Sequence, residues 1–294
     1  MTMRKRSSPR GKNSDQKVPV TTFQTIILGI VQGLTEFLPI SSSGHLVLVP
    51  HLLGWDLSKS QDFFVFDVLV QVATLLAVFA YFWSDLIAIL RAVVVGLVTR
   101  RPFADPLARL GWFIVLATIP AGLVGLLLKN AVESAFSSLL MTAVFLFVTA
   151  ALLIFAERVG QRNRSIEDMN WKDALIIGAF QALSIFPGVS RSGSTITGAM
   201  QRDLNRPDAA RFSFLMSIPI MLAAGLLAFL DMLKVPNLDQ LLPIYIPGFA
   251  VAAVVGYLAI RWLLRFLHNN SLYLFAGYCI FAGMVGLLLS IIGR

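Results

Sequence analysis

The residues in this sequence that are best suited to chemistry lie in two serine-rich segments. Glu36 precedes the run Ser41–Gly44 and His45 follows it, whereas Arg191 lies inside the run Pro187–Thr195. Both segments are embedded in long apolar stretches. An ionisable group in such surroundings is costly, by about 2.5–3.5 kcal/mol for an arginine at the centre of a bilayer, and it therefore indicates a functional site.

The two segments are related by an internal repeat. Residues 29–45 align without a gap with residues 178–194, at a constant offset of 149. The identical pairs are Gly29/Gly178, Gln32/Gln181, Leu34/Leu183, Phe37/Phe186, Ser41/Ser190, Ser43/Ser192 and Gly44/Gly193. Glu36 and His45 have no counterpart of the same type in the second copy, and Arg191 has none in the first. Since the offset is close to half the chain, the pattern predicts an asymmetric site on a duplicated scaffold.

The second segment has the composition of a phosphate site. Backbone N–H groups at a helix start, hydroxyl groups and a guanidinium together suit a phosphate group. The first segment repeats the serine-glycine turn, so two such turns would face one anion. The predicted phosphate-binding residues are Arg191, Ser42, Ser43, Ser190, Ser192 and Thr195. The structural alternative for Arg191 is a buried ion pair with Glu36 that holds the two halves together.

Glu36 and His45 add reactivity that anion binding alone does not need. A carboxylate repels an anion unless it is protonated, bound to a cation or acting as a base. We therefore expect a general base or nucleophile together with a leaving-group acid or a metal ligand, and Glu36 and His45 are the predicted catalytic residues. Gln32 lies one helical turn before Glu36, and these two are the predicted ligands of a divalent cation. The alternative for His45 is a hydrogen-bonded interior histidine, and Asp67 is expected to face a polar vestibule or to cap its helix.

The composition predicts a membrane protein. Hydrophobic residues make up 57% of the chain and charged residues 14%, and the mean hydropathy is +0.77. Several apolar runs reach the length of about 20 residues that a helix needs to cross a bilayer. A chain of this composition would be hard to keep in solution. The single Cys279 also excludes an intrachain disulfide and a cysteine metal cluster.

Six apolar runs are predicted to span the membrane, and two further segments are broken. The expected spans are residues 63–83, 110–128, 139–156, 212–230, 242–264 and 272–292, with an amphipathic helix at 86–98 and a polar loop at 201–208. The broken segments are residues 22–53 and 174–200. Two short half-helices with a polar turn suit a re-entrant hairpin, because irregular backbone at membrane depth must be buried in protein or line a cavity.

Each half of the chain therefore contains one broken segment and three spans. Since three is odd, the second half enters the membrane from the opposite side, which predicts an inverted-topology repeat with the broken helices meeting near the midplane. We expect one all-α polytopic membrane domain at 21–294, built from repeats at about 21–158 and 170–294. Residues 1–20 form a basic tail that is predicted to be disordered. A signal peptide is the alternative, but Glu36 inside the following run and the internal match argue against cleavage.

The positive charges predict the orientation. The loops at 100–109 and 158–172 are rich in arginine and lysine and are expected in the cytoplasm. The hairpin around Ser43 would then open to the outer face of the membrane. The tail, with six positive charges in residues 1–17, would lie outside against the same rule.

The two motifs resemble the signatures of a known family, the undecaprenyl-diphosphate phosphatases of the bacitracin-resistance type. The residues that carry the resemblance are Gln32-Gly-Leu-Thr-Glu36, the following Ser-Ser-Ser-Gly-His45 and Pro187-Gly-Val-Ser-Arg-Ser-Gly-Ser-Thr195. The resemblance covers nearly all of the chain after residue 20. It implies a multi-pass hydrolase of the bacterial inner (plasma) membrane. Such an enzyme removes the terminal phosphate of undecaprenyl diphosphate with a divalent cation such as Mg²⁺ or Ca²⁺, and so recycles the lipid carrier of peptidoglycan synthesis.

The resemblance also implies roles for residues. The family's catalytic glutamate and histidine correspond to Glu36 and His45, and its phosphate-binding arginine corresponds to Arg191. Ser42, Ser190, Ser192 and Thr195 accompany that arginine. The family has Glu or Gln at the first acidic position of its first motif. This chain has Gln32, so a role that needs a carboxylate there would fall to Glu36 alone. Which group attacks phosphorus is left open.

Two other functions are considered. A lipid-phosphate or anion transporter would use the same inverted repeat and would need Arg191 equally. A membrane scaffold protein would not need two matched polar clusters. The expected partners are a polyprenyl diphosphate lipid and membrane lipids, with no nucleic acid, and a homodimer is considered.

Overall fold

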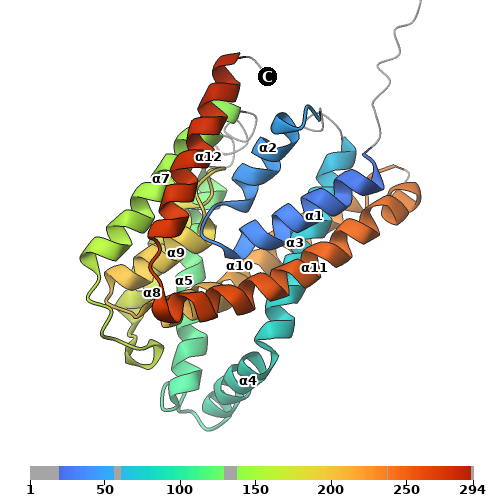
Figure 1. Ribbon diagram of the computed structural model, residues 1–294. Helices are drawn as coiled ribbons and strands as arrows, with labels where there is room; N and C mark the ends of the chain where they lie inside the picture. The colour runs from blue at the N-terminus through green and yellow to red at the C-terminus, as the bar shows by residue number, and fades with distance from the viewer. Residues whose placement is uncertain (1–19, 56–60, 129–137, 237, 293–294) are drawn as a thin grey trace, which may run out of the picture.

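The protein is helical throughout the part of the chain that the computed structural model describes, which is residues 20–55, 61–128, 138–236 and 238–292. Eleven α-helices and one short 3-10 helix are joined by turns and loops within these ranges (Figure 1). The prediction of an all-α fold is confirmed. The predicted basic tail, residues 1–20, falls outside the described residues except for its last position.

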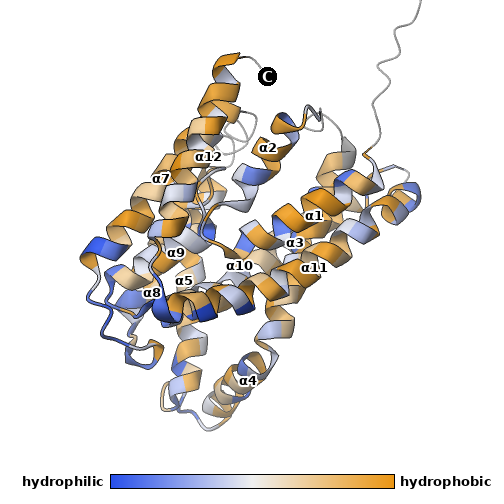
Figure 2. Ribbon diagram, in the orientation of Figure 1, coloured by the Kyte–Doolittle hydropathy of each residue, from blue (hydrophilic) through white to orange (hydrophobic). Residues whose placement is uncertain are grey.

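Six helices in the described ranges are long and apolar enough to cross a membrane, as predicted. They are α3 (Gln61–Tyr81), α5 (Pro106–Leu127), α7 (Leu139–Val159), α10 (Arg206–Met232), α11 (Leu238–Asn269) and α12 (Tyr273–Ile292). Apolar residues cover much of their surface (Figure 2), and Leu126, Leu227 and Phe281 are all more than half exposed. Apolar surface of this extent suits contact with lipid.

Three of the spans, α5, α10 and α11, begin at least four residues earlier than the apolar pattern predicts. α5 begins at Pro106 and not at residue 110, and α10 begins at Arg206, inside the segment expected to be a polar loop. An N-cap sets the starts of α5 and α10, because the side chains of Asp105 and Asn205 accept hydrogen bonds from N–H groups of the first turn. Each of these two helices also has a proline in that turn, where its missing N–H is not needed. The apolar run marks the lipid-facing part of a helix, whereas the cap marks its first residue.

Four shorter helices form the two broken segments. α1 (Thr22–Phe37) and α2 (Ser42–Leu52) come from the first, and α8 (Trp171–Leu183) and α9 (Arg191–Gln201) come from the second. They contain 16, 11, 13 and 11 residues, fewer than a helix needs to cross a bilayer. The re-entrant insertion of these pairs stays a prediction. The inverted topology of the repeats, with bounds of about 21–158 and 170–294, stays one too.

The first helix of each broken segment ends near a proline, which has no N–H to donate, and a residue with positive φ. After α1, Pro39 has no N–H to donate, and Ser41 has a φ of 74°. After α8, Pro187 is followed by Gly188, which has a φ of 99°, a conformation that glycine adopts at little cost. A proline and a residue with positive φ therefore end the first helix of each pair.

Both broken segments are seated against spanning helices by a glycine. α1 packs along α11, as Figure 1 shows, and α8 packs against α5. A Cβ on Gly29 would lie 2.3 Å from the carbonyl oxygen of Gly248, and one on Gly178 would lie 2.4 Å from that of Ala117. Gly29 and Gly178 are a matched pair of the sequence repeat. The two copies therefore use the same position for close backbone approach.

Two buried carboxylates tie the loop ends of α7, α8, α9 and α10 together. Glu157 pairs with Arg162 and Arg206, and Asp173 pairs with Arg164 and Arg202. Burial alone would raise the pKa of the Asp173 carboxyl, but hydrogen bonds from Arg164, Arg202 and the Asn170 N–H outweigh burial and hold it below its usual value. Several arginines counted in the basic loops are thus partners of internal carboxylates.

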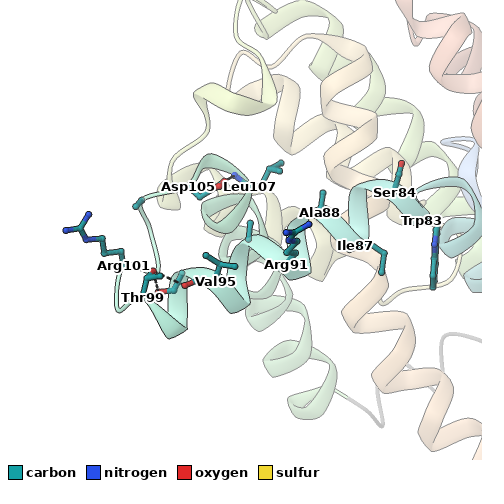
Figure 3. A pocket seen from close by; sticks show the side chains of 13 residues that line it. Trp83, Ser84, Ile87, Ala88, Arg91, Val95, Thr99, Arg101, Asp105 and Leu107 are labelled. Carbon is teal, nitrogen blue, oxygen red and sulfur yellow. Dashed lines mark hydrogen bonds between the residues drawn. The ribbon is translucent and has the colours of Figure 1, made fainter.

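Two of the cavities among the described helices bear on the location of the site. One, of about 710 Å³, lies between α4 (Trp83–Val98) and the start of α5, at the edge of the bundle (Figure 3). Arg91 and Arg101 line it, but none of the residues predicted to bind phosphate or to react does so. α4 corresponds to the amphipathic helix expected at 86–98. The other cavity lies between the two broken segments.

Candidate active site

The cavity between the broken segments brings together residues that are about half the chain apart in sequence. It has a volume of about 710 Å³ and is lined by α1, α2, α3, α5, α10 and the turn from α8 into α9. Its charged lining residues, among those described, are Glu36, Asp67 and Arg191. Apolar side chains of α5 and α10, such as Leu126 and Leu227, form another part of the wall. The site therefore has a polar end and an apolar side.

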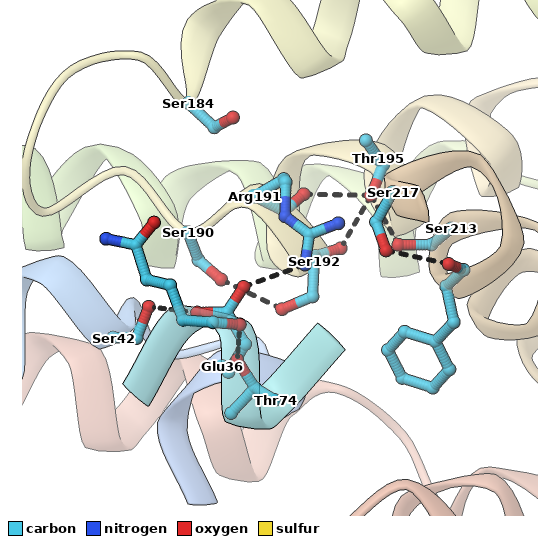
Figure 4. Close-up of polar contacts among 12 residues, drawn as sticks. Glu36, Ser42, Thr74, Ser184, Ser190, Arg191, Ser192, Thr195, Ser213 and Ser217 are labelled. Atoms are coloured by element: carbon cyan, nitrogen blue, oxygen red, sulfur yellow. Dashed lines mark hydrogen bonds and ion pairs between the residues drawn. The ribbon is translucent and has the colours of Figure 1, made fainter. Parts of the chain in front are cut away.

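Glu36 is the centre of the polar end. One carboxylate oxygen accepts a hydrogen bond from Arg191 at 2.9 Å, and the other accepts one from the Ser42 hydroxyl at 2.6 Å (Figure 4). Gln32 Nε2 also donates to the second oxygen, at 3.1 Å. The proximity of Glu36 and Arg191 that was considered from the sequence is present. Because both residues line a cavity, the pair is accessible to a ligand and is not sealed in a core.

Arg191 is placed by the start of α9. Ser190 is the N-cap, so Arg191 is the first residue of the helix, where backbone N–H groups are free of helical partners. The Arg191 side chain is 15% exposed. Its Nη2 atom donates to Glu36, whereas its Nη1 atom is buried without a hydrogen-bond partner. A guanidinium nitrogen is therefore left for an acceptor such as a phosphate oxygen.

The serine-glycine turns start α2 and α9 in the same way. Ser41 Oγ accepts a hydrogen bond from Gly44 N–H at 3.2 Å, and Ser190 Oγ accepts one from Gly193 N–H at 3.1 Å. These caps follow from local sequence, because a serine three residues before an N–H donor is a preferred N-cap. In each copy the next residue, Ser42 or Arg191, is presented to the cavity.

The remaining predicted phosphate ligands divide into two groups. Ser42, Ser43, Ser190 and Arg191 line the cavity, and their phosphate-binding role stays a prediction. Ser192 and Thr195 are not among the lining residues and are 1% and 0% exposed. The Ser192 hydroxyl donates to the Leu38 carbonyl across the two segments, and Thr195 shares a hydrogen bond with Ser213 on α10 (Figure 4). Their roles as direct phosphate ligands stay predictions, and their contacts are those of residues that fix α9 in place.

His45 faces away from the cavity. It is 3% exposed and is not among the lining residues. One ring nitrogen, Nδ1, lies 2.7 Å from the Ser41 carbonyl oxygen, and the other, Nε2, lies 2.8 Å from the Tyr278 hydroxyl of α12. Both nitrogens therefore have partners. The geometry is that of the hydrogen-bonded interior histidine considered as the alternative, and a catalytic role for His45 stays a prediction.

Asp67, Gln71 and Gln181 are polar cavity residues to which no chemistry was assigned from the sequence. Asp67 and Gln71 lie one turn apart on α3, with the Gln71 amide donating to Asp67 at 2.9 Å. Gln181, the repeat partner of Gln32, also lines the cavity, and both atoms of its buried amide lack partners. The repeat pairing is a signal for Gln181 in the sequence. Asp67 carries only the signal of a lone carboxylate in an apolar span.

The predicted cation ligands lie side by side. The described residues contain no group of three or more His, Cys, Asp or Glu side chains that could hold a metal ion. Gln32 and Glu36 are joined by a hydrogen bond, and Gln32 Oε1 is buried without a partner. Oxygen atoms of this kind are the ligands of Mg²⁺ and Ca²⁺, and Mg²⁺ commonly completes its shell with water and substrate phosphate. The residues present therefore fit an oxygen-ligated cation.

Comparison with known proteins identifies the family. The model of the family "Bacitracin resistance protein BacA" matches residues 25–285. Among similar proteins, the undecaprenyl-diphosphatase of Methanosphaera stadtmanae is 41% identical, over 91% of this chain and 97% of its own length. The undecaprenyl-diphosphatases of Thermomicrobium roseum and Myxococcus xanthus are 43% and 39% identical, over 92% and 94% of this chain and 98% and 91% of their own lengths. Since the match covers nearly the whole chain and includes both serine-rich segments, this protein belongs to the bacitracin resistance protein BacA family.

Proposed function

We propose that this protein hydrolyses undecaprenyl diphosphate to undecaprenyl phosphate and inorganic phosphate. The observation that carries the proposal is the arrangement around Glu36, which holds the Ser42 hydroxyl at 2.6 Å and the Arg191 guanidinium at 2.9 Å in one cavity. Relatives that match over nearly the whole chain are named undecaprenyl-diphosphatases, which supports the same conclusion.

Arg191 and the start of α9 would bind the terminal phosphate. The unpartnered Nη1 and the free N–H groups of the first turn offer hydrogen bonds to oxygens that gain charge during the reaction. Ser190 Oγ is used as the cap of α9, so its contribution is to hold this helix start in position. Gln181, with a buried amide that lacks partners, adds a donor on the same wall.

Glu36 and Ser42 would carry the bond exchange. Glu36 is placed to take the proton of the Ser42 hydroxyl, whose oxygen then attacks the terminal phosphorus. The anhydride P–O bond breaks and undecaprenyl phosphate leaves. The departing undecaprenyl phosphate takes that proton from Glu36. Water then attacks the phosphoserine, and Glu36 takes a proton from the water and returns it to the Ser42 oxygen as the serine O–P bond breaks, which releases inorganic phosphate and regenerates the Ser42 hydroxyl. The alternative, in which Glu36 activates water directly, needs no phosphoserine.

A divalent cation at Glu36 and Gln32 would neutralise phosphate charge and polarise the bond to be broken. The side-chain amide of Gln32 has a fixed orientation, because its Nε2 donates to Glu36. Its Oε1 therefore points away from that carboxylate and is left for a cation. The proposed cation is Mg²⁺ or Ca²⁺.

His45 would act through Ser41. Ser41 has a φ of 74°, which is unfavourable for a residue with a Cβ, and its carbonyl oxygen is held by the imidazole of His45. Tyr278 fixes the other ring nitrogen. The pair thus holds the turn that presents Ser42 to Glu36, which makes His45 a positioning residue in this mechanism.

The apolar wall would receive the isoprenyl chain. Ile220, Met221 and Leu227 on α10 and Leu126 on α5 extend this wall of the cavity. A lipid whose diphosphate lies at Arg191 could leave its chain along this wall without exposing it to water. The architecture suits a substrate that stays in the membrane during catalysis.

The cavity would open to the outer face of the plasma membrane. It is lined by the last third of α5, from Ala121 to Leu126, and by the first half of α3, from Phe63 to Gln71. The basic loop at 100–109 lies at the opposite ends of these two helices. Since basic loops face the cytoplasm, the cavity would face away from it.

Phosphate release from a C55 isoprenyl diphosphate by the purified full chain tests the proposed reaction. We expect multiple turnovers that are lost with a chelator and restored by Mg²⁺ or Ca²⁺. A protein that binds a non-hydrolysable isoprenyl diphosphonate but releases no phosphate with either cation would contradict hydrolysis and support the transporter.

Labelling with an impermeant thiol reagent tests the orientation. Glu167 and Asp239 are exposed near opposite ends of the spans, and the native Cys279 is buried. In intact cells we expect labelling of Asp239→Cys and not of Glu167→Cys. The reverse pattern would place the cavity on the cytoplasmic side.

A further inference from the structure

The cavity contains a carboxylate, Asp67, to which the proposed roles assign no function. Its charged lining residues in the described ranges are two carboxylates, Glu36 and Asp67, and one guanidinium, Arg191. With the carboxyl groups ionised, the lining carries one net negative charge. A diphosphate is itself an anion, so this lining alone would repel the substrate. A divalent cation reverses the sign and leaves one net positive charge for the phosphate.

Asp67 has more free capacity for a cation than Glu36. A carboxylate has about four lone-pair sites. Glu36 accepts three hydrogen bonds, from Arg191, Ser42 and Gln32. Asp67 accepts one side-chain hydrogen bond, from Gln71 at 2.9 Å, through Oδ2 only. The Asp67 and Glu36 carboxylates also line the same cavity, where like charges repel each other. A cation bound between them would remove that repulsion.

Gln32 supplies a third oxygen, and this observation is independent of the two carboxylates. Gln32 is 1% exposed, lines the cavity and has an Oε1 atom with no partner. Its amide cannot be turned over, because the oxygen would then face the Glu36 carboxylate in place of Nε2. A buried carbonyl oxygen without a donor costs free energy. A bound cation would satisfy it.

We propose that Asp67 is a further ligand of the divalent cation that the proposed function places at Glu36 and Gln32 Oε1. The proposal rests on the proposed function, in which a cation at Glu36 serves the diphosphate. It adds a residue from α3, outside both serine-rich motifs. Glu36 and Asp67 would then form a pair of carboxylates at the cation site.

The arrangement also explains Gln71. One turn after Asp67, its amide donates to Oδ2 and fixes the carboxylate while leaving Oδ1 free of side-chain donors. Partners of this kind orient metal ligands in many sites. The alternative is that Asp67 and Gln71 only bind water in the cavity. In that case neither residue affects cation binding.

Cation binding without substrate tests the proposal separately from catalysis. Mn²⁺ is titrated into the detergent-solubilised full chain, and the free ion is followed by electron paramagnetic resonance, with Mg²⁺ and Ca²⁺ as competitors. We expect one displaceable site in the wild type and a rise in its dissociation constant of about tenfold or more in Asp67→Asn. Asp239→Asn, which removes an exposed carboxylate outside the cavity, is the matched control and should bind as the wild type does.

The outcomes separate the two proposals. Wild-type Mn²⁺ affinity in folded Asp67→Asn would overturn the role of Asp67, whatever the phosphate-release assay shows. Cation binding that depends on Asp67 in a protein that releases no phosphate would support the site and contradict the proposed hydrolysis. If Asp67→Asn does not fold, Asp67→Ser gives the same comparison, because serine is smaller and uncharged.

Discussion

The two broken helix pairs share their framework and differ in the residues that they present to the cavity. α2 and α9 have equivalent N-caps: Ser41 Oγ accepts a hydrogen bond from Gly44 N–H, and Ser190 Oγ accepts one from Gly193 N–H. The residue after each cap is Ser42 in one copy and Arg191 in the other. Both residues bind Glu36, one on each carboxylate oxygen. The comparison shows that the duplicated turn positions the side chains, whereas Glu36, Ser42 and Arg191, which differ between the two copies, supply the chemistry.

The matched serines join the two copies to each other. Ser43 Oγ accepts a hydrogen bond from Gly188 N–H, and the Ser192 hydroxyl donates to the Leu38 carbonyl. Ser43 and Ser192, a matched pair, therefore each contact the turn of the opposite segment. A symmetric frame of this kind keeps its shape when single residues diverge, which is consistent with Glu36 standing opposite Ile185 in the aligned sequences.

The largest expected effect comes from removing the acid that only the first pair has. Glu36→Gln should lower the rate of phosphate release about a thousandfold, because a general base contributes factors of this order. Binding of a non-hydrolysable isoprenyl diphosphonate should stay within about tenfold, or about 1.4 kcal/mol, since the phosphates are held by the second pair. Near-wild-type turnover in this variant would remove Glu36 from the mechanism.

A Ser42 variant tests whether Ser42, the residue after the N-cap of α2, and Glu36 act together in the same reaction step. Ser42→Ala should lower the rate by nearly as much as Glu36→Gln, and the double variant should be no slower than Glu36→Gln alone. Ser184→Ala is the control, because Ser184 lines the same cavity but donates to the Gln181 carbonyl. Multiplicative losses in the double variant would show that Glu36 activates water independently of Ser42.

Arg191 tests the residue after the second cap. Arg191→Lys should lower the rate about a hundredfold although the charge is kept, because lysine lacks the planar fork that bonds Glu36 and a phosphate oxygen together. Arg211→Lys serves as the control, since Arg211 pairs with Asp85 outside the cavity. Equal activity of the two lysine variants would contradict the assigned role.

Variants of His45, which aligns with Ser194 in the second copy, test whether this residue positions Ser41 or reacts. His45→Gln and Tyr278→Phe should each lower the rate about tenfold or less and leave the shape of the pH–rate profile unchanged, because the proposed role is to hold Ser41. A loss as large as that of Glu36→Gln, with one limb of the profile removed, would instead support the predicted catalytic role of His45.

The glycine pair tests the shared frame and should affect stability more than catalysis. Gly29→Ala and Gly178→Ala should each lower the free energy of unfolding by about 1–3 kcal/mol, because a Cβ would meet a neighbouring backbone carbonyl. Gly225→Ala is the control, since a Cβ there meets nothing within 4 Å. Thermal unfolding of the purified variants measures the difference. Unequal effects at Gly29 and Gly178 would show that the two copies are seated differently.

Much of the fold follows from the sequence because its causes are local. Apolar runs of spanning length predict six membrane helices, and six are present in the described residues. The start of α10 was predicted late because its cap, Asn205, lies in a polar stretch that reads as a loop. The serine caps of α2 and α9 depend on residues three positions apart, so the aligned motifs predict them directly.

The sequence by itself determined the membrane class, the repeat, and the gathering of Glu36, Ser42 and Arg191 at one site. Only the tertiary structure decided which faces of those helices meet the cavity. Ser192 and His45 belong to the motifs yet point into the protein, whereas Asp67 lies outside both motifs yet lines the site. The physical reason is that helical periodicity fixes the angle between side chains on one helix. The neighbour that covers each face is set by packing between helices far apart in sequence, such as α1 with α11 and α8 with α5.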